Sequence, residues 1–267
     1  MIASVHNRRV VDAARLSRRR DREETRTFLV DGPRAVLAAI RSGASVRQVF
    51  HVARSGAAVD EAVQEGIRRG APTAEVSHAV MARLASTVTP QGVVAVVGFL
   101  DVPIRAVGPA VGLVAVLVEV ADPGNAGTIV RTADAAGADA VVCTAGSVDL
   151  YNPKVVRASA GSLFHLPMVR DVDAAGAIGH LRASGFAVVA ADAAGPASVY
   201  DADLTGPTAV LFGNEAHGLR PDLLEAADAV VRVPMAGRAE SLNLAAAAAV
   251  ILFEAGRRRS LDSRLHG

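Results

Sequence analysis

The sequence predicts an α/β protein with two domains, and three observations support this prediction. Its 267 residues exceed the usual length of one domain, and 51% of them are hydrophobic, enough to fill two cores. Short β-branched runs alternate with amphipathic stretches, which is typical of α/β domains. Two prolines and a glycine in residues 100–109, LDVPIRAVGP, predict a linker. The expected division is a smaller domain of residues 1–100, a linker of 101–110 and a domain of 111–267.

The N-terminal domain is expected to begin with a short basic helix and to continue with alternating strands and helices. Apolar residues at helical spacing predict the helices, and β-branched or aromatic runs predict the strands. The expected helices are 5–16, 32–42, 57–69 and 77–86, and the expected strands are 27–30, 46–52 and 92–99.

The second domain opens with the continuous apolar run VGLVAVLVEVA at residues 111–121, which is typical of a central parallel strand covered on both faces. A turn at Asp122-Pro-Gly follows, and Asn125 is expected to cap a helix over 126–136 that Gly137 ends. The remaining expected strands are 140–143, 186–191, 208–212 and 229–233, and the remaining expected helices are 152–162, 173–184, 221–227 and 242–253.

Several classes of protein are excluded by what the sequence lacks. No apolar run reaches the ~18 residues of a membrane span, and arginines stand where a signal peptide needs its apolar stretch, so a cytoplasmic location is expected. A single cysteine, Cys143, excludes an internal disulfide. There is no phosphate loop, no GxGxxG and no paired Cys/His spacing, so neither a dinucleotide fold nor a metal site is expected.

Basic residues are unevenly distributed, although the net charge is only +1. Eight arginines fall between Arg8 and Arg26, and they include the run Arg18, Arg19 and Arg20. Planar guanidinium groups pair well with phosphate oxygens, so this cluster suits phosphate contacts. An exposed, solvated face is an equally good interpretation of the cluster taken alone.

Three polar loops each follow a predicted strand. They are residues 122–131 (DPGNAGTIVR), 213–219 (GNEAHGL) and 234–243 (PMAGRAESLN). Ligands of open α/β sheets bind at the carboxyl ends of the strands, so the loops predict one shared site. Ser241 and Asn243 lie where the last helix begins, which favours a small-molecule cradle.

These loops, together with residues 149–167, resemble the signature motifs of the SpoU (TrmH-like) RNA ribose 2′-O-methyltransferases of the SPOUT class. The resemblance covers residues 111–254. On weaker marks, Phe28-Leu-Val-Asp-Gly and Pro90-Gln-Gly, the N-terminal domain is similar to the substrate-binding domain of members that act on ribosomal RNA, which is related to ribosomal RNA-binding proteins. The resemblance implies a C-terminal trefoil knot, S-adenosylmethionine as cofactor, RNA as partner, no metal, and a homodimer with its active sites at the subunit junction.

The resemblance also implies roles for individual residues. The implied catalytic residues are Arg131, Asn125, Glu215, Ser241 and Asn243. The implied cofactor contacts are Leu211, Gly213, Val233, Met235 and Leu242. The implied RNA contacts are Lys154 and Arg157, with Arg18, Arg19 and Arg20 added from the arginine cluster. Because a guanidinium is a poor base, Arg131 is expected to orient the 2′-hydroxyl together with an RNA phosphate, and Glu215 is expected to hold Arg131 or the ribose.

Four alternatives remain open beside a methyltransferase acting on large-subunit ribosomal RNA. One is the same chemistry on transfer RNA, which the separate N-terminal domain argues against. Another is an antibiotic self-resistance enzyme acting on ribosomal RNA. A third is an RNA-binding protein without catalysis. The last is a Rossmann-type methyltransferase, for which Pro123 and Asn125 stand where close-approach glycines are needed.

Overall fold

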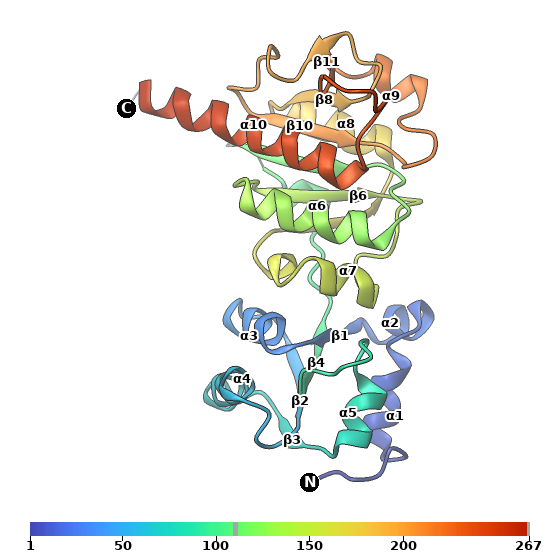
Figure 1. Ribbon diagram of the computed structural model, residues 1–267, viewed down its shortest axis with the longest axis vertical. Helices are drawn as coiled ribbons and strands as arrows, with labels where there is room; N and C mark the ends of the chain where they lie inside the picture. Colours follow the sequence, from blue (N-terminus) through green and yellow to red (C-terminus); the bar gives the residue numbers. More distant parts are fainter. Residues whose placement is uncertain (109–111, 266–267) are drawn as a thin grey trace. The chain divides into compact units, whose positions relative to one another are not determined.

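The computed structural model describes residues 1–108 and 112–265, and it divides the chain into two compact units (Figure 1). The first unit contains Met1–Leu100 and Tyr151–His165, and the second contains Asp101–Leu150 and the chain from Leu166 onwards. The sequence analysis places residues 151–165 in the second domain instead. The end of the expected linker and the start of the expected second domain, residues 109–111, lie outside the described residues.

A four-stranded sheet forms the centre of the first unit. Its strands, in spatial order, are β1 (Thr27–Asp31), β4 (Val93–Gly98), β2 (Val46–His51) and β3 (Thr73–Glu75). β4 is antiparallel to both of its neighbours, whereas β2 and β3 are parallel. The sequence analysis missed β3, which is only three residues long.

Two pairs of helices cover the two faces of this sheet (Figure 1). The helices are α1 (Arg8–Arg15) with α5 (His78–Leu84) on one face and α3 (Pro33–Arg41) with α4 (Ala57–Arg68) on the other. Val10 of α1 and Met81 of α5 pack with Phe50 in a buried cluster. A further helix, α2 (Arg19–Thr25), was not predicted because its charged sequence has no apolar spacing.

The segment Tyr151–His165 belongs to the first unit through aromatic packing. The ring centroid of Tyr151 lies 4.6 Å from that of Phe28 and 3.9 Å from that of Phe99, and its hydroxyl accepts a hydrogen bond from the Leu100 N–H at 2.7 Å. The segment contains α7 (Pro153–Ala158) and the short 3-10 helix η2 (Ser162–Phe164). The expected helix 152–162 ends early, because Ala160 and Gly161 have φ angles of 51° and 102°.

The second unit is built on a seven-stranded parallel sheet. In spatial order its strands are β7 (Met168–Val172), β6 (Ala140–Thr144), β5 (Leu113–Leu117), β10 (Thr208–Phe212), β8 (Ala187–Ala191), β11 (Ala229–Arg232) and β9 (Ala197–Ser198). β5 ends four residues earlier than predicted, and Glu119 just beyond it has a φ of 53° that interrupts the extended backbone. β7 and β9 were not predicted.

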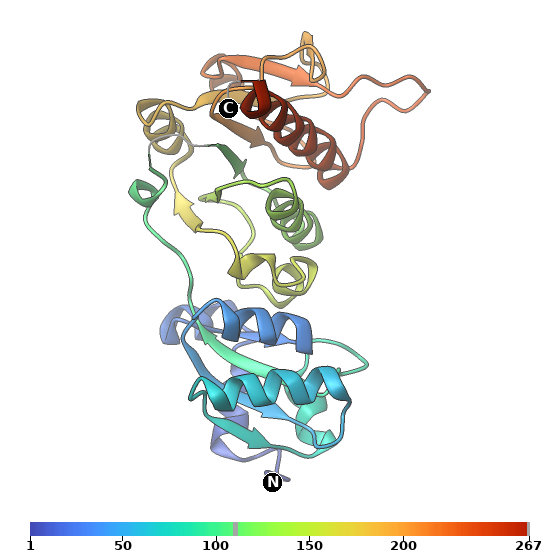
Figure 2. The same cartoon turned by 90° about the vertical axis from the view of Figure 1, so that its left-hand side faces the viewer.

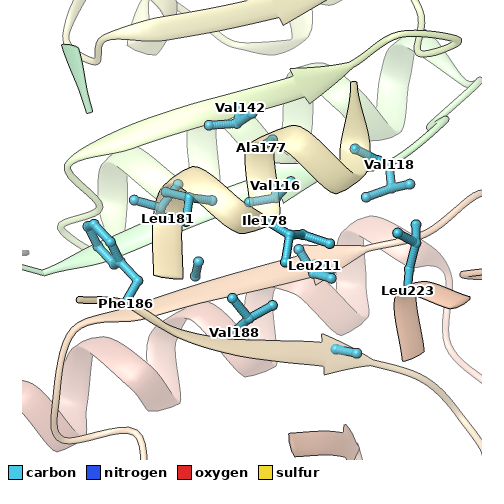
Figure 3. Packing of buried hydrophobic residues seen from close by; sticks show 14 of the residues in the cluster. Val116, Val118, Val142, Ala177, Ile178, Leu181, Phe186, Val188, Leu211 and Leu223 are labelled. Carbon is cyan, nitrogen blue, oxygen red and sulfur yellow. The ribbon is translucent and has the colours of Figure 1, made fainter. Parts of the chain in front are cut away.

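Helices cover both faces of this sheet. α6 (Pro123–Ala135) and α10 (Leu244–Leu265) pack against each other on one face, where a Cβ at Gly256 would lie only 2.6 Å from the carbonyl oxygen of Ala136. On the other face, α8 (Ala174–Ala183) and α9 (Pro221–Glu225) cover a core of branched aliphatic side chains (Figure 3). This is the mixed α/β fold with a parallel sheet that the sequence predicts.

The single cysteine of the sequence is a core residue. Cys143 is buried in β6, and burial raises the pKa of its thiol.

Across the residues described here, none of the helices has the length and apolarity needed to span a bilayer.

Candidate active site

A cavity of about 720 Å³ opens in the second unit, at the carboxyl ends of β8, β10 and β11 and beside the start of α10. All three predicted loops contribute to its wall. The predicted site residues that line it are Asn125, Gly213, Glu215, Val233, Met235, Ser241, Leu242 and Asn243. Figure 2, turned by 90° from Figure 1, shows the long loop that precedes α10.

The loop after β10 folds back on itself. Asn214 and Gly218 exchange two backbone hydrogen bonds of 3.1 and 2.9 Å, and the Asn214 side chain donates to the Glu119 carbonyl at 2.7 Å. A Cβ at Gly213 would lie 2.4 Å from the Gly218 carbonyl carbon, so only glycine permits this tight turn. The close approach of the Gly218 backbone therefore explains the glycine at position 213.

The start of α6 corrects one prediction. Asp122, not Asn125, is the N-cap, because its carboxylate accepts from the Asn125 N–H at 2.8 Å and Pro123 occupies the first helical position. The Asn125 side chain is therefore available for other contacts on the cavity wall.

A hydrogen-bond network joins three of the five expected catalytic residues. The Asn125 amide nitrogen donates to the Glu215 carboxylate at 2.9 Å, and the Asn125 amide oxygen accepts from the Asn243 amide at 3.1 Å. Asn243 in turn accepts from the N–H groups of Ala245 and Ala246 and so caps α10. Two loops and a helix start are thereby fixed relative to one another.

Glu215 has a structural role in this network. Partial burial by itself raises the pKa of its carboxyl, but hydrogen bonds from the Asn125 side chain and from the Ala121 and Asp122 N–H groups outweigh burial and lower the pKa below its usual value. Glu215 is consequently an ionised acceptor near neutral pH. Its hydrogen bonds join it to the start of α6. Arg131, one of the two partners that the sequence analysis expected for Glu215, is not among these contacts, and the other, the ribose, stays a prediction.

Two expected site residues lie away from the cavity. Arg131 is exposed on α6, and its side chain makes no hydrogen bond or ion pair with any described residue. Leu211 is fully buried in the core under α8 (Figure 3), on the opposite face of β10 from the cavity. The next residue, Phe212, lines the cavity instead, because successive side chains of a strand point to opposite faces.

The expected RNA contacts are all in the first unit. Lys154 is exposed on α7, and Arg157 donates to the backbone and side-chain oxygens of Ser86 at 3.3 Å. Arg18, Arg19 and Arg20 are exposed. Arg22 of the same cluster is buried and donates to the carbonyls of Leu16 and Ser17, so it closes the end of α1 and is not available to a partner.

The sequence analysis missed part of the cavity wall. Ala191, Asp192 and Ala193 line the cavity after β8, and His217 and Glu240 line it from two of the predicted loops. The rule that located the other loops, a polar residue directly after a parallel strand, also applies to Asp192. Within residues 1–108 and 112–265, no group of three or more His, Cys, Asp or Glu side chains is placed to hold a metal ion.

Comparison with known proteins agrees with this geometry. The chain matches the SpoU rRNA Methylase family over residues 112–253 and the MRM3-like substrate binding domain over residues 7–95. The 23S rRNA (guanosine(2553)-2'-O)-methyltransferase RlmP of Bacillus subtilis (strain 168) is 33% identical over 253 residues, covering 94% of this chain and 97% of the relative.

Solved structures are similar along nearly the whole chain. A crystal structure of an AdoMet-bound rRNA methyltransferase from Sinorhizobium meliloti is 35% identical, with a TM-score of 0.86 and coverage of 96% of this chain and 97% of that one. The SpoU methyltransferase AviRb from Streptomyces viridochromogenes, in complex with AdoMet, is 34% identical, with a TM-score of 0.84 and coverage of 96% and 99%. The knot that the resemblance implies stays a prediction. By its sequence match and by its similarity over nearly all of the relative's length, the chain belongs to the SpoU rRNA Methylase family.

Proposed function

We propose that this protein transfers a methyl group from S-adenosylmethionine to a ribose 2′-hydroxyl of large-subunit ribosomal RNA. The observation that carries the proposal is the cavity in which three family motifs meet, with Glu215, Asn125 and Asn243 joined in one network. The names of the relatives, which methylate 23S rRNA or bind AdoMet, support the same activity.

The cavity suits this cofactor in size and charge. A volume of about 720 Å³ falls within the range of cofactor sites, and Val233, Leu242 and Ile251 give it apolar walls. Its acidic lining residues are Asp122, Asp192, Glu215 and Glu240, whereas no lysine or arginine among the described residues lines it. A cofactor that carries a positively charged sulfonium fits such a wall better than an anionic ligand does.

The residues of the chain have distinct tasks in the proposed reaction. The bound cofactor supplies an electrophilic methyl group. Asn125 and Asn243, whose amides are fixed by the network, orient the polar groups of the substrate ribose, and the exposed Ser241 extends this polar surface at the cavity wall. Because Glu215 is held as an ionised acceptor, it fixes the loops and does not donate a proton.

The first unit supports ribosomal RNA as the substrate. The substrate-binding domain match covers most of that unit, and exposed Arg18, Arg19, Arg20 and Lys154 offer cations for phosphate contacts. The same unit is the reason to prefer ribosomal over transfer RNA. A cytoplasmic location is part of the same proposal, because ribosomal RNA is its substrate. We assign residues 1–100 to substrate binding and residues 111–267 to catalysis, except for residues 151–165, which belong to the first unit.

We also propose a homodimer in which Arg131 acts in the cavity of the partner subunit. Arg131 is exposed and outside the cavity of its own chain. Phe253 of the neighbouring helix α10 is 53% exposed, which is a large apolar side chain for a free surface. An arrangement that covers Phe253 and brings Arg131 to a second cavity accounts for both observations.

Complementation tests this arrangement. Arg131→Ala and Asn125→Ala should each be inactive, and mixing the unfolded and refolded chains should restore about a quarter of wild-type activity, since about half of the dimers are mixed and each has one intact site. No recovery, in mixtures that light scattering shows to be dimeric, would mean that Arg131 acts within its own chain.

The enzymatic proposal itself is tested with labelled cofactor. Purified protein and S-[methyl-³H]adenosylmethionine are incubated with ribosomal RNA from cells that lack the protein, with transfer RNA and with ribosomal RNA from cells that have it. Label should enter only the first RNA, at a nucleotide whose 2′-oxygen then resists alkaline cleavage. Label in transfer RNA alone would change the substrate, and cofactor binding without any transfer would favour a non-catalytic RNA-binding protein.

A further inference from the structure

Asp192 is a carboxylate of the cavity with one unoccupied oxygen. Its Oδ1 accepts from the Ala194 N–H at 2.8 Å, and its backbone N–H donates to the Val231 carbonyl at 3.0 Å, so the side chain has a fixed orientation. Within the described chain, Oδ2 accepts no hydrogen bond. This oxygen points towards the loop after β10, because it lies 3.7 Å from the position of a Cβ on Gly218.

The other three carboxylates of the cavity differ from Asp192. Asp122 caps α6, and Glu215 accepts three hydrogen bonds from the start of the same helix. Glu240 lies exposed in the loop before α10. Asp122 also has one oxygen that no described residue uses, but its position caps a helix. Asp192 alone among these four has such an oxygen directly after a strand.

The sheet places Asp192 between two expected cofactor contacts. Ala191 is in register with Phe212 of β10 on one side and with Val231 of β11 on the other, so Asp192 lies between the chain at Gly213 and the chain leading to Val233. Asn125 follows β5, which is two strands away, roughly 10 Å at the usual strand spacing. Asp192 is therefore remote from the residues that handle the 2′-hydroxyl.

The surroundings of Asp192 distinguish between the two ends of the cofactor. Val231 of the neighbouring strand β11 and Val233 just after it line the cavity and suit a flat nucleobase, whereas the amino-acid end carries two charges. A ribose next to that base offers two neighbouring hydroxyl donors. A carboxylate after a parallel strand that accepts from a ribose hydroxyl is a known solution in other nucleotide-binding sheets.

We infer that Asp192 is a cofactor-specificity residue whose free carboxylate oxygen accepts a hydrogen bond from the ribose diol of S-adenosylmethionine. The inference rests on the proposed function, since it requires that this cavity hold an adenosine cofactor. It predicts that the residue contributes to cofactor binding and takes no part in methyl transfer.

Calorimetry on the full chain tests it with three probes: S-adenosylmethionine, S-adenosylhomocysteine and 5′-methylthioadenosine, which has the ribose but lacks the amino-acid end. Asp192→Asn should weaken all three by a similar factor, about 10- to 100-fold, the usual effect of losing a charged acceptor. Asp192→Ser keeps an acceptor for the Ala194 N–H and should weaken binding of the three probes by a similar factor to Asp192→Asn. Asp201→Asn is the matched control and should bind like the wild type, because Asp201 is an exposed carboxylate of the same unit that does not line the cavity.

A cycle with the 2′- and 3′-deoxy forms of 5′-methylthioadenosine identifies the partner group. Removing the relevant hydroxyl should weaken binding to the wild type but not to Asp192→Asn. Unchanged affinity in both Asp192 variants, or weakening of S-adenosylmethionine without weakening of 5′-methylthioadenosine, would overturn the inference while leaving the proposed function intact. A wild-type protein that binds none of the probes would overturn both.

Discussion

At the scale of single residues, the side chain of Asn125 shows how the site is assembled. Its amide nitrogen and amide oxygen are both in hydrogen bonds, one to Glu215 and one from Asn243. An Asn can meet a donor and an acceptor at once, whereas an Asp of the same shape would place a second negative charge beside Glu215. The requirement for asparagine at this position thus follows from its two neighbours.

Arg131 is the residue for which binding and chemistry should separate. Arg131→Ala should keep its affinity for S-adenosylmethionine, because the expected cofactor contacts are near Gly213, Val233 and Leu242 and do not include Arg131. Methyl transfer should fall by at least ~100-fold, the usual effect of losing a positioned electrostatic group. Single-turnover transfer of labelled methyl at saturating enzyme measures this step.

Arg131→Lys is the matched control for charge. It should not restore transfer, since an ammonium cannot reproduce the planar guanidinium fork. A near-normal single-turnover rate in Arg131→Ala would show that another residue activates the 2′-hydroxyl.

Residue types allowed most of the cavity wall to be anticipated, but not the direction of every side chain. Eight of the ten expected catalytic and cofactor residues line the cavity. Leu211 was chosen where its neighbour Phe212 reaches the cavity, because sequence shows that a strand alternates but not which face meets the site. The cap was assigned to Asn125 rather than Asp122 because both types cap well, although Pro123 marks the first helical position.

At the scale of elements, α10 continues well past its predicted end at residue 253. Glu254 is buried, with 9% of its surface exposed, and accepts hydrogen bonds from Arg257 and Arg258 on the next turn. Arg258 also donates to the carbonyl of Tyr200, so this ion cluster ties the helix to the chain after β9. The apolar run ends here, which explains why hydrophobic spacing alone did not predict the extension.

Because of this ion cluster, the free energy of unfolding should decrease as the pH falls in the acid range. The hydrogen bond from Arg257 is the main cause that lowers the pKa of Glu254 to about 2, from an ordinary 4.5, despite the opposing effect of burial. A carboxyl with a lowered folded pKa stabilises the protein fully above pH 4.5, and this contribution is lost as the pH falls towards 2.

Glu254→Gln should therefore melt below the wild type at pH 7, and the difference should narrow as the pH falls from 4.5 towards 2. Thermal unfolding followed by circular dichroism measures both proteins across this range. Glu61→Gln is the control. Glu61 forms an exposed ion pair with Arg41, so its replacement should alter the melting temperature little. A constant difference between Glu254→Gln and wild type at all pH values would show that the charge is not responsible.

Whether a segment forms a strand or a helix could be predicted where the hydrophobic pattern is long, as in β5, β10 and α6. The short strands β3 and β9 were not, because two or three residues carry no periodicity. Helix α2 consists mainly of charged residues and is fixed by the buried guanidinium of Arg22, which is a tertiary contact that a local pattern does not reveal.

At the scale of the whole molecule, the first unit contains residues 151–165 as well as residues 1–100, and a truncation has to take this into account. Removing residues 1–100 exposes the buried side chains of Tyr151, Val155 and Leu163, which pack within that unit. The truncated chain should bind S-adenosylmethionine, because every residue of the cavity wall is in the second unit, but it should aggregate more readily.

RNA affinity should fall at least ~10-fold in the same truncated chain, since the exposed arginines and the substrate-binding unit are lost. Filter binding at several salt concentrations measures this, and the full chain should show the steeper salt dependence. Replacing Arg18, Arg19 and Arg20 with Ala in the full chain is a control that leaves the packing intact. If truncation and the triple replacement both leave RNA affinity unchanged, the second unit must hold the RNA by itself.

The chain passes between the two units three times, after Leu100, after Leu150 and after His165. Recombination at a single breakpoint therefore cannot exchange the substrate-recognition part for that of a relative. A chimera joined only at residue 100 would set foreign residues 1–100 against the native Tyr151, which would lose its aromatic neighbours Phe28 and Phe99. An exchange that keeps this packing intact has to transfer residues 1–100 together with residues 151–165.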